Sequence, residues 1–177
     1  MKSSHQESGF TLLLSLLVIS VILSVSFGVF DVMTKELKLS GLGRESQIAF
    51  YAADAGIECA YFWDIKQKEF ENEDGWPKTD ANYSIECANK VIGKNFSFDG
   101  GKYTTDFQFD MGIATTQKCA MVTVTKSIEN KKVENIDYKI TTTTIESKGY
   151  NYWCTSTSPH KVERAIRVIS TKTEEVE

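Results

Sequence analysis

The first pattern along the chain is a long apolar segment near its N-terminus. Nine mostly polar residues precede residues 10–30, which read FTLLLSLLVISVILSVSFGVF and carry no charge. A helix of this length spans about 31 Å at 1.5 Å per residue, close to the hydrocarbon thickness of a bilayer. A removable secretory signal is the alternative, but its apolar core is usually about 7–15 residues long and ends at a small-residue cleavage site. Ser24, Ser26 and Gly28 do not make a good site of that kind, so the pattern favours a membrane span.

Helical periodicity continues beyond the span, without proline, to about residue 64. Within SQIAFYAADAGIECAYFWD, small and apolar side chains recur at steps of three and four and form one broad face. The acidic residues Glu45, Asp54 and Glu58 fall largely outside that face. We therefore expect one helix over residues 10–64 whose later half lays a stripe on a partner surface. A bend is expected, if anywhere, at Gly41 and Gly43, because each glycine weakens a helix by about 1 kcal/mol relative to alanine.

From residue 83 onward the period changes from helical to alternating. In residues 103–111 apolar and polar side chains alternate, and residues 119–128, 138–147 and 162–171 are rich in β-branched types. Gly100 and Gly101, after Asp99, suit a tight hairpin turn that needs positive φ. We expect about five mostly antiparallel strands, with a segment of low order around residues 69–80. The fold class is α+β: a long N-terminal helix, its first half transmembrane, packed on a small antiparallel sheet.

The four cysteines all follow the apolar segment, and none forms a C-x-x-C pair. Two disulfides would place this part of the chain in an oxidising compartment, outside the cytoplasm; four buried free thiols are the alternative. The distribution of basic residues weakly favours the opposite topology, because Lys2 alone precedes the span whereas Lys35, Lys38 and Arg44 follow it. Three pairings are open. We favour the pairs that would tie the helix end to the first strand and staple the later strands, namely Cys59–Cys87 and Cys119–Cys154.

Composition narrows the function classes. With 24 acidic against 20 basic residues the net charge is -4, which argues against a protein that binds nucleic acid through its phosphates. His5 and His160 lie far apart in the sequence, and no two cysteines have the spacing of zinc ligands. We therefore predict no metal centre, no cofactor and no nucleophilic triad. Asp99, Asp106 and Asp110 do not form a calcium loop and are expected in turns and on the solvent face. We predict that the chain is not an enzyme.

Two motifs carry a resemblance to a known family. Gly9-Phe10-Thr11 opening an uncharged span resembles the class III leader of type IV prepilins. Residues 49–56, AFYAADAG, resemble the A-F-x-A-A-E-A-G signature of PilX-type minor pilins. The positions that match are Ala49, Phe50, Ala52, Ala53, Asp54, Ala55 and Gly56. Together the motifs cover roughly the first third of the chain.

The resemblance implies a pathway and a set of partners. A prepilin peptidase would cut after Gly9 and methylate Phe10, so residues 1–9 would be a leader, 10–30 a transmembrane and assembly helix, 31–64 its amphipathic continuation and 65–177 an extracytoplasmic β domain. The partners implied are other pilin subunits, the peptidase, an inner-membrane assembly platform and, before assembly, membrane lipid. No sequence-specific nucleic acid is implied. The chain would reside in the cytoplasmic membrane as a single-pass protein and then in an extracellular filament.

The sequence departs from the family at one position. Major pilins carry a glutamate where this chain has Leu14, and some minor pilins and pseudopilins at a filament tip also lack it. The resemblance therefore favours a minor, initiating or tip-located subunit over a main structural one, although simple loss of the glutamate is the alternative. Ser20, Ser24 and Gly28 recur every four residues, a spacing that lets membrane helices approach closely but that also arises by chance.

Other candidate features are weaker. Asn82 and Asn95 begin N-x-S patterns that are glycan acceptors in some proteins and common by chance. Trp63, Trp76 and Trp153 suit either a sheet core or an adhesive patch. A single-pass anchored sensor or binding domain is the main alternative function, since it would share the span and the oxidised domain. Whether the chain serves a pilus, a secretion pseudopilus or a competence system is open.

Overall fold

The computed structural model describes residues 8–70, 84–113, 117–134 and 136–176, and in them one helix precedes seven strands. The elements are α1 (Ser8–Ile65), β1 (Ile85–Cys87), β2 (Lys90–Ile92), β3 (Asn95–Asp99), β4 (Lys102–Met111), β5 (Lys118–Val133), β6 (Ile136–Tyr150) and β7 (Glu163–Val176). The chain divides into two compact units, Met1–Arg44 and Glu45–Glu177. We call them the helix unit, which holds the first part of α1, and the sheet unit, which holds the end of α1 and all the strands.

The single long helix predicted from the sequence is confirmed, with bounds that differ from 10–64 by one or two residues. It continues through Gly41 and Gly43, so these residues do not end it. In the helix unit every side chain described from residue 10 to residue 44 is exposed, except for the half-buried Thr34. Among the described residues α1 alone is long and apolar enough to cross a membrane, which is consistent with single-pass anchoring.

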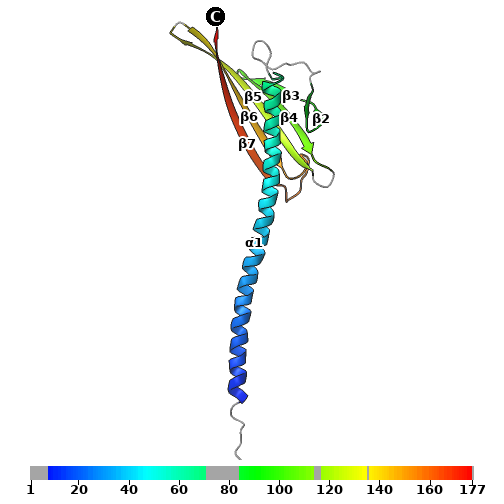
Figure 1. Ribbon diagram of the computed structural model, residues 1–177, viewed down its shortest axis with the longest axis vertical. Coiled ribbons are helices and arrows are strands. Elements are labelled where there is room, and N and C mark those ends of the chain that lie inside the picture. The colour runs from blue at the N-terminus through cyan, green and yellow to red at the C-terminus, as the bar shows by residue number, and fades with distance from the viewer. Residues whose placement is uncertain (1–7, 71–83, 114–116, 135, 177) are drawn as a thin grey trace, which may run out of the picture. The chain divides into compact units, whose positions relative to one another are not determined.

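The sheet unit contains a five-stranded antiparallel sheet in the order β3–β4–β5–β6–β7, so each strand pairs with its neighbour in sequence (Figure 1). A separate two-stranded hairpin, β1–β2, was not predicted and brings the described strands to seven. The missed strands have three residues each. Their turn uses Ala88 and Asn89 at φ of 52° and 60°, and this pair lacks the glycine that marks such turns in a sequence.

The predicted glycine turn is confirmed. Gly100 and Gly101 have φ of 55° and 78°, and Asp99 pairs directly with Lys102, so β3 and β4 form a hairpin with a two-residue loop. Two consecutive positive φ values match the right-handed twist of the strands, and glycine reaches them without steric cost.

One face of the large sheet is covered by the end of α1 (Figure 1). The alternation predicted in β4 is confirmed, because Thr105, Phe107 and Phe109 are buried while Asp106 and Gln108 are exposed. The core joins side chains of the helix, the small hairpin and the sheet, and its members include Ile57, Ala60, Phe70, Ile85, Ile92, Phe107, Phe109, Val122, Val124 and Ile145.

The segment of low order that we predicted for residues 69–80 is wrong at its first two residues. Glu69 and Phe70 are both buried, and Phe70 stacks on Phe107 with ring centroids 6.2 Å apart. The turn after α1 is drawn inward because the backbone N–H of Glu69 donates to the carbonyl of Trp63 at 2.9 Å. The rest of that segment, residues 71–80, lies outside the described residues, as do Trp76 and Asn82.

Candidate functional site

The helix unit presents an uncovered apolar surface. Phe10 is 71% exposed and Leu14 is 50% exposed. A side chain added at Gly28 would have no heavy atom within 4 Å. Gly9 and Phe10 lie in the first turn of α1. Such a surface is unfavourable in water, which is consistent with anchoring in a membrane.

The serines in this segment are compatible with an apolar surrounding. The hydroxyl of Ser20 donates to the carbonyl of Leu17, and that of Ser24 donates to the carbonyl of Ser20, both at 2.8 Å. Ser15 and Ser26 make equivalent bonds within the helix. In hydrocarbon an unsatisfied polar group costs several kcal/mol, and these bonds avoid that cost. The hydroxyls of Ser20 and Ser24 therefore have their acceptors within α1 itself.

Residues 49–56 hold the helix against the sheet. Ala49, Ala52, Ala53 and Gly56 are buried, whereas Phe50 is exposed and Asp54 and Ala55 are half-buried. The small stripe therefore covers one sheet face, as the sequence predicted.

The approach is close enough to require glycine on both elements. A Cβ on Gly56 would lie 2.9 Å from Val122 and 3.1 Å from Ala120, and would also overlap the hydroxyl of Ser147. A Cβ on Gly149 of β6 would overlap the helix backbone at Ala49.

Both disulfides form in the favoured pairing. Cys59 of α1 is joined to Cys87 of β1 with Cα atoms 5.9 Å apart, and Cys119 of β5 is joined to Cys154 with Cα atoms 5.2 Å apart. The first ties the helix to the small hairpin, where Trp63 also donates its indole N–H to the carbonyl of Glu86 at 3.0 Å. The second closes the segment after β6 onto β5.

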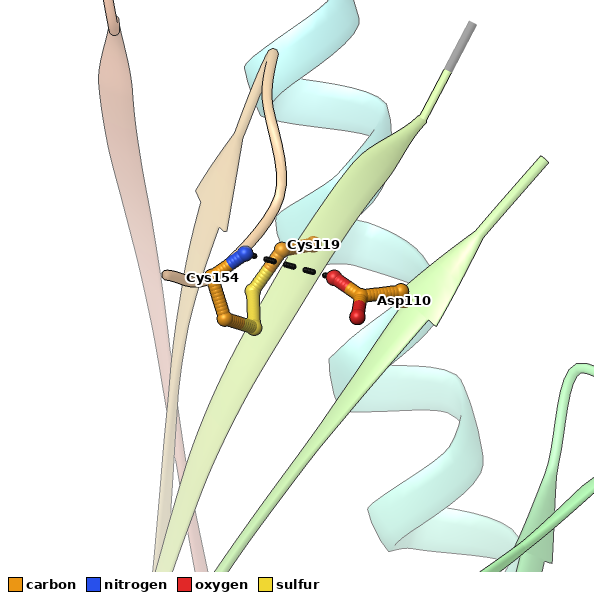
Figure 2. Close-up of side chains that lie close together, drawn as sticks. All are labelled: Asp110, Cys119 and Cys154. Carbon is orange, nitrogen blue, oxygen red and sulfur yellow. Dashed lines mark hydrogen bonds between the residues drawn. A yellow bond between two sulfur atoms is a disulfide. The ribbon is translucent and has the colours of Figure 1, made fainter. Parts of the chain in front are cut away.

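Asp110 lies beside the second disulfide, as Figure 2 shows. Its Oδ1 accepts a hydrogen bond from the backbone N–H of Cys154 at 3.2 Å. The carboxylate and the two sulfurs are close enough together to surround a metal ion, but both sulfurs are joined in the disulfide. A metal binds the thiolate form of cysteine, which the disulfide does not offer, so the cluster cross-links the segment after β6 to β5. Asp106 likewise has a local partner, since its carboxylate accepts from the hydroxyl of Thr123 at 2.6 Å.

The loop between β6 and β7 is fixed to the helix by one amide. Asn151 is buried, and its side-chain N–H groups donate to Glu45 Oε2 at 2.8 Å and to the carbonyl of His160 at 3.1 Å. Its Oδ1 accepts from the backbone N–H of Val162 at 2.7 Å. Glu45, which the pattern placed outside the packed face of the helix, therefore contributes to packing through a hydrogen bond.

The predicted glycan acceptor Asn95 and the tryptophans Trp63 and Trp153 lie in different parts of the sheet unit. Asn95 is exposed at the start of β3, and Trp153 is 45% exposed in the loop after β6. Trp63 packs against the core. These tryptophans do not meet in a single patch within the described residues.

Two buried ion pairs were missed by the sequence analysis. Lys126 Nζ lies 2.7 Å from Asp64 Oδ1, and Lys94 Nζ lies 2.5 Å from Glu69 Oε1, with all four side chains at most 10% exposed. Lys126 had a usable signal, because it occupies the inward-facing position that follows Val122 and Val124 in β5. Lys94 and Glu69 had none, since nothing in the sequence brings together two residues so far apart.

Comparisons of the chain with known protein families, with curated proteins and with solved structures find no match.

Proposed function

We propose that this chain is a minor pilin or pseudopilin, a structural subunit of a type IV pilus-like filament. In this proposal a prepilin peptidase removes residues 1–9 and methylates Phe10. The subunit then resides in the cytoplasmic membrane, with its sheet unit on the extracytoplasmic side. An assembly platform transfers it from there to other pilin subunits. The proposal assigns the chain no catalytic activity.

The observation that carries the proposal is the uncharged, exposed segment of α1 over residues 10–30, which directly follows Gly9 in the sequence. Its serine hydroxyls are bonded to its own backbone, so lipid and the apolar helices of other subunits are equivalent surroundings for it. Assembly would then be a change of solvent from lipid to protein. The small residues Ser20, Ser24 and Gly28 would allow close helix packing during that change.

Two further observations support the proposal. The motif residues Ala49, Ala52, Ala53 and Gly56 are buried where the helix meets the sheet, which gives the motif a packing role. The paired cysteines favour an oxidising compartment for the sheet unit.

A tip or initiating position follows from Leu14. A glutamate buried in a filament core needs a partner, because an unpaired buried carboxylate is costly. A subunit with no neighbour ahead of it would lack that partner, and leucine avoids the cost. We therefore place this chain among the first subunits of the filament.

The deciding experiment is intact mass and N-terminal sequencing of the protein purified from its native membranes. A chain that begins at Phe10 and carries one added methyl group supports the proposal. Gly9→Leu should block this processing, whereas Gly28→Ala, a matched change in open space, should leave it intact. A chain that still begins at Met1 contradicts the proposal and favours the alternative of a single-pass anchored sensor or binding domain.

One observation favours that alternative specifically. The sheet unit contains a cavity lined by both polar and apolar side chains, which an anchored binding domain would use directly. An N-terminus near Gly28 would contradict both functions, because it would identify an ordinary secreted protein.

A further inference from the structure

The large sheet has two edges, and the outer side of each edge strand pairs with no other strand among the described residues (Figure 1). β3 forms one edge and β7 forms the other. All fourteen residues of β7 pair one to one with β6, and β7 contains neither a bulge nor a proline. The outer side of such a strand presents backbone N–H and C=O groups to any further strand that approaches it. Each copy of the chain therefore offers two edges for pairing.

Apolar side chains lie at both edges on the face of the sheet that α1 covers. Phe98 of β3 lies opposite Tyr103, two residues before the buried Thr105, and is therefore on that face. The ring of Phe98 contacts Tyr103, yet the residue is 60% exposed. At the other edge, Ile166 and Val168 of β7 are half-buried and pack against the core. A further strand at either edge would cover apolar surface, which is favourable in water.

The cavity of the sheet unit lies beside the β7 edge, near the end of α1. Its volume is about 360 Å³, and its apolar lining includes Tyr61, Ile65, Ile145 and Val168. Polar side chains line the rest of it. Tyr61 is 47% exposed at this place. A strand added to β7 would bring its inward side chains next to Val168, so an aromatic ring at that level would pack against the apolar lining.

The direction of the strands decides which strand can pair with β7. Arg164 Nε, near the start of β7, donates to Ser46 Oγ at 2.7 Å, whereas Tyr61 and Ser170 line the same cavity further along both elements. α1 and β7 therefore run in the same direction within the sheet unit. A symmetric pair of β7 strands would be antiparallel and would reverse α1 in one of the two copies. Two chains anchored through α1 in one membrane cannot be arranged in that way.

The β3 edge meets this requirement. β3 runs in the same direction as β7, because the four pairings that connect them across the sheet are all antiparallel. β3 of a second copy can thus lie parallel to β7 of the first while α1 keeps one direction in both copies.

We propose that the β7 edge of one copy receives the β3 edge of a second copy, so that the two sheets join into one. In the register that matches apolar positions, Phe98 of the second copy lies level with Val168 and packs into the apolar part of the cavity beside Tyr61. Phe96 then lies level with Ile166. The contact is head-to-tail and leaves one edge of each kind open for further copies. β3 has only five residues, and a shared membrane compensates by raising the effective concentration of the copies.

This inference deepens the proposed function, because it names a surface through which subunits meet. It rests on that function only for the anchoring of the copies in one membrane, and it does not need cleavage after Gly9. Gly9→Leu, which should block processing, should therefore leave the contact between copies intact. Failure of the processing and failure of the contact are thus distinguishable.

The test is cysteine cross-linking of the full chain in its native membranes, since the four native cysteines are already paired. In the proposed register, Asp99 of one copy lies level with Ile169 of the next, and both residues are exposed. Chains with Asp99→Cys and chains with Ile169→Cys, expressed together, should form a disulfide-linked dimer on mild oxidation. A chain with both substitutions should form a ladder of dimers, trimers and longer species, because each copy then carries a thiol at both edges.

Two variants locate the contact from its opposite sides. Phe98→Ser and Tyr61→Ser should each lower the yield of the cross-link about tenfold, because each removes aromatic surface from the interface. Val91→Ser is the matched control and should leave the yield unchanged, because Val91 is 73% exposed on β2, outside both edges of the large sheet. Thermal unfolding followed by circular dichroism shows whether each variant is folded, and either variant alone is sufficient for the test.

Three outcomes would overturn the proposal. Lack of a cross-link between Asp99→Cys and Ile169→Cys would show that the two edges do not meet. An equal yield between Asp99→Cys and Lys148→Cys, an exposed position on β6 inside the sheet, would indicate random collision. A dimer formed by Ile169→Cys chains alone, at the yield of the mixed pair, would identify symmetric pairing of β7 with β7 in its place.

Discussion

Gly149 of β6 lies directly against the helix backbone at Ala53. A Cβ built on Gly149 would overlap the backbone nitrogen of Ala53 and the carbonyl oxygen of Ala49, neither of which can move without displacing the helix. On the facing side, Ala49, Ala52 and Ala53 leave room for the strand because they are small. The alanine-rich motif thus has a geometric counterpart on the sheet, and both are needed for the helix and the sheet to meet at this distance.

We expect Gly149→Ala to destabilise the sheet unit by about 1–3 kcal/mol, the usual cost of overpacking, and by more if the helix must shift. Urea unfolding followed by tryptophan fluorescence of the micelle-solubilised chain measures this change. The control is Gly93→Ala, since a Cβ at Gly93 meets no heavy atom within 4 Å. Equal stability of the two variants would show that the contact at Ala49 and Ala53 is looser than described.

Removing the Cys119–Cys154 disulfide with a pair of serine substitutions should lower the free energy of unfolding by about 2–4 kcal/mol. The bridge joins residues 35 apart and holds the backbone that donates to Asp110. Urea unfolding measures the loss. Non-reducing peptide mapping of the parent chain is the control, and a peptide joining Cys59 to Cys119 or Cys154 would contradict the pairing.

The buried pair of Lys126 and Asp64 should behave differently from an exposed pair. Lys126→Met leaves the carboxylate of Asp64 buried without a cation and is expected to cost about 3–5 kcal/mol. Replacing both residues, as Lys126→Met with Asp64→Leu, should recover most of that loss. Lys132→Met, which breaks a surface pair with Asp137, is the control and should cost less than about 1 kcal/mol. If the double variant is as unstable as the single one, desolvation of Asp64 is not the cause.

Tyr150 gives the sheet unit a pH dependence in the alkaline range. Partial burial raises the pKa of the Tyr150 hydroxyl to about 12, helped by its hydrogen bond to Glu163 and by the negative charge of that carboxylate. Because the pKa is higher in the folded state than the ordinary value of 10.0, this contribution to stability is complete below pH 10 and is lost as the pH rises toward 12.

The titration of Tyr150 is isolated by subtracting the tyrosinate absorbance of Tyr150→Phe from that of the parent chain. Glu163→Gln should lower the Tyr150 pKa, since the amide carries no negative charge. An unchanged alkaline titration in Glu163→Gln would rule out Glu163 as a cause of the shift.

Leu14→Glu tests the proposed tip position. If this chain starts a filament, a glutamate at position 14 would have no partner ahead of it, and filament initiation should fall. Counting surface filaments by electron microscopy in cells that express each form measures the effect. Leu13→Ala, an apolar change at the neighbouring position, is the control for helix length and insertion. Unchanged filament numbers in Leu14→Glu would contradict the tip position while leaving the pilin proposal intact.

Several features were predictable because they depend on local pattern. The helix followed from an uncharged apolar run that continues into a small-residue stripe, and its bounds were predicted to within two residues. The sheet strands followed from alternation, as in β4, where Phe107 and Phe109 point inward. The hairpin turn followed from Gly100 and Gly101, because few other residues adopt positive φ without strain.

Other features required the tertiary structure. Alternation places Lys126 on the inner face of β5, but only the point at which α1 ends brings Asp64 to it and leaves the cavity beside Tyr61. The choice among three disulfide pairings likewise depended on which strand lies beside which. The physical reason is the sequence separation over which each effect acts. Backbone preferences and burial periodicity act over a few residues, so the sequence by itself determined the helix, the strands of the large sheet and the glycine turn. Ion pairs, cavities and cross-links join residues tens of positions apart, and only the packing of the helix on the sheet decided them.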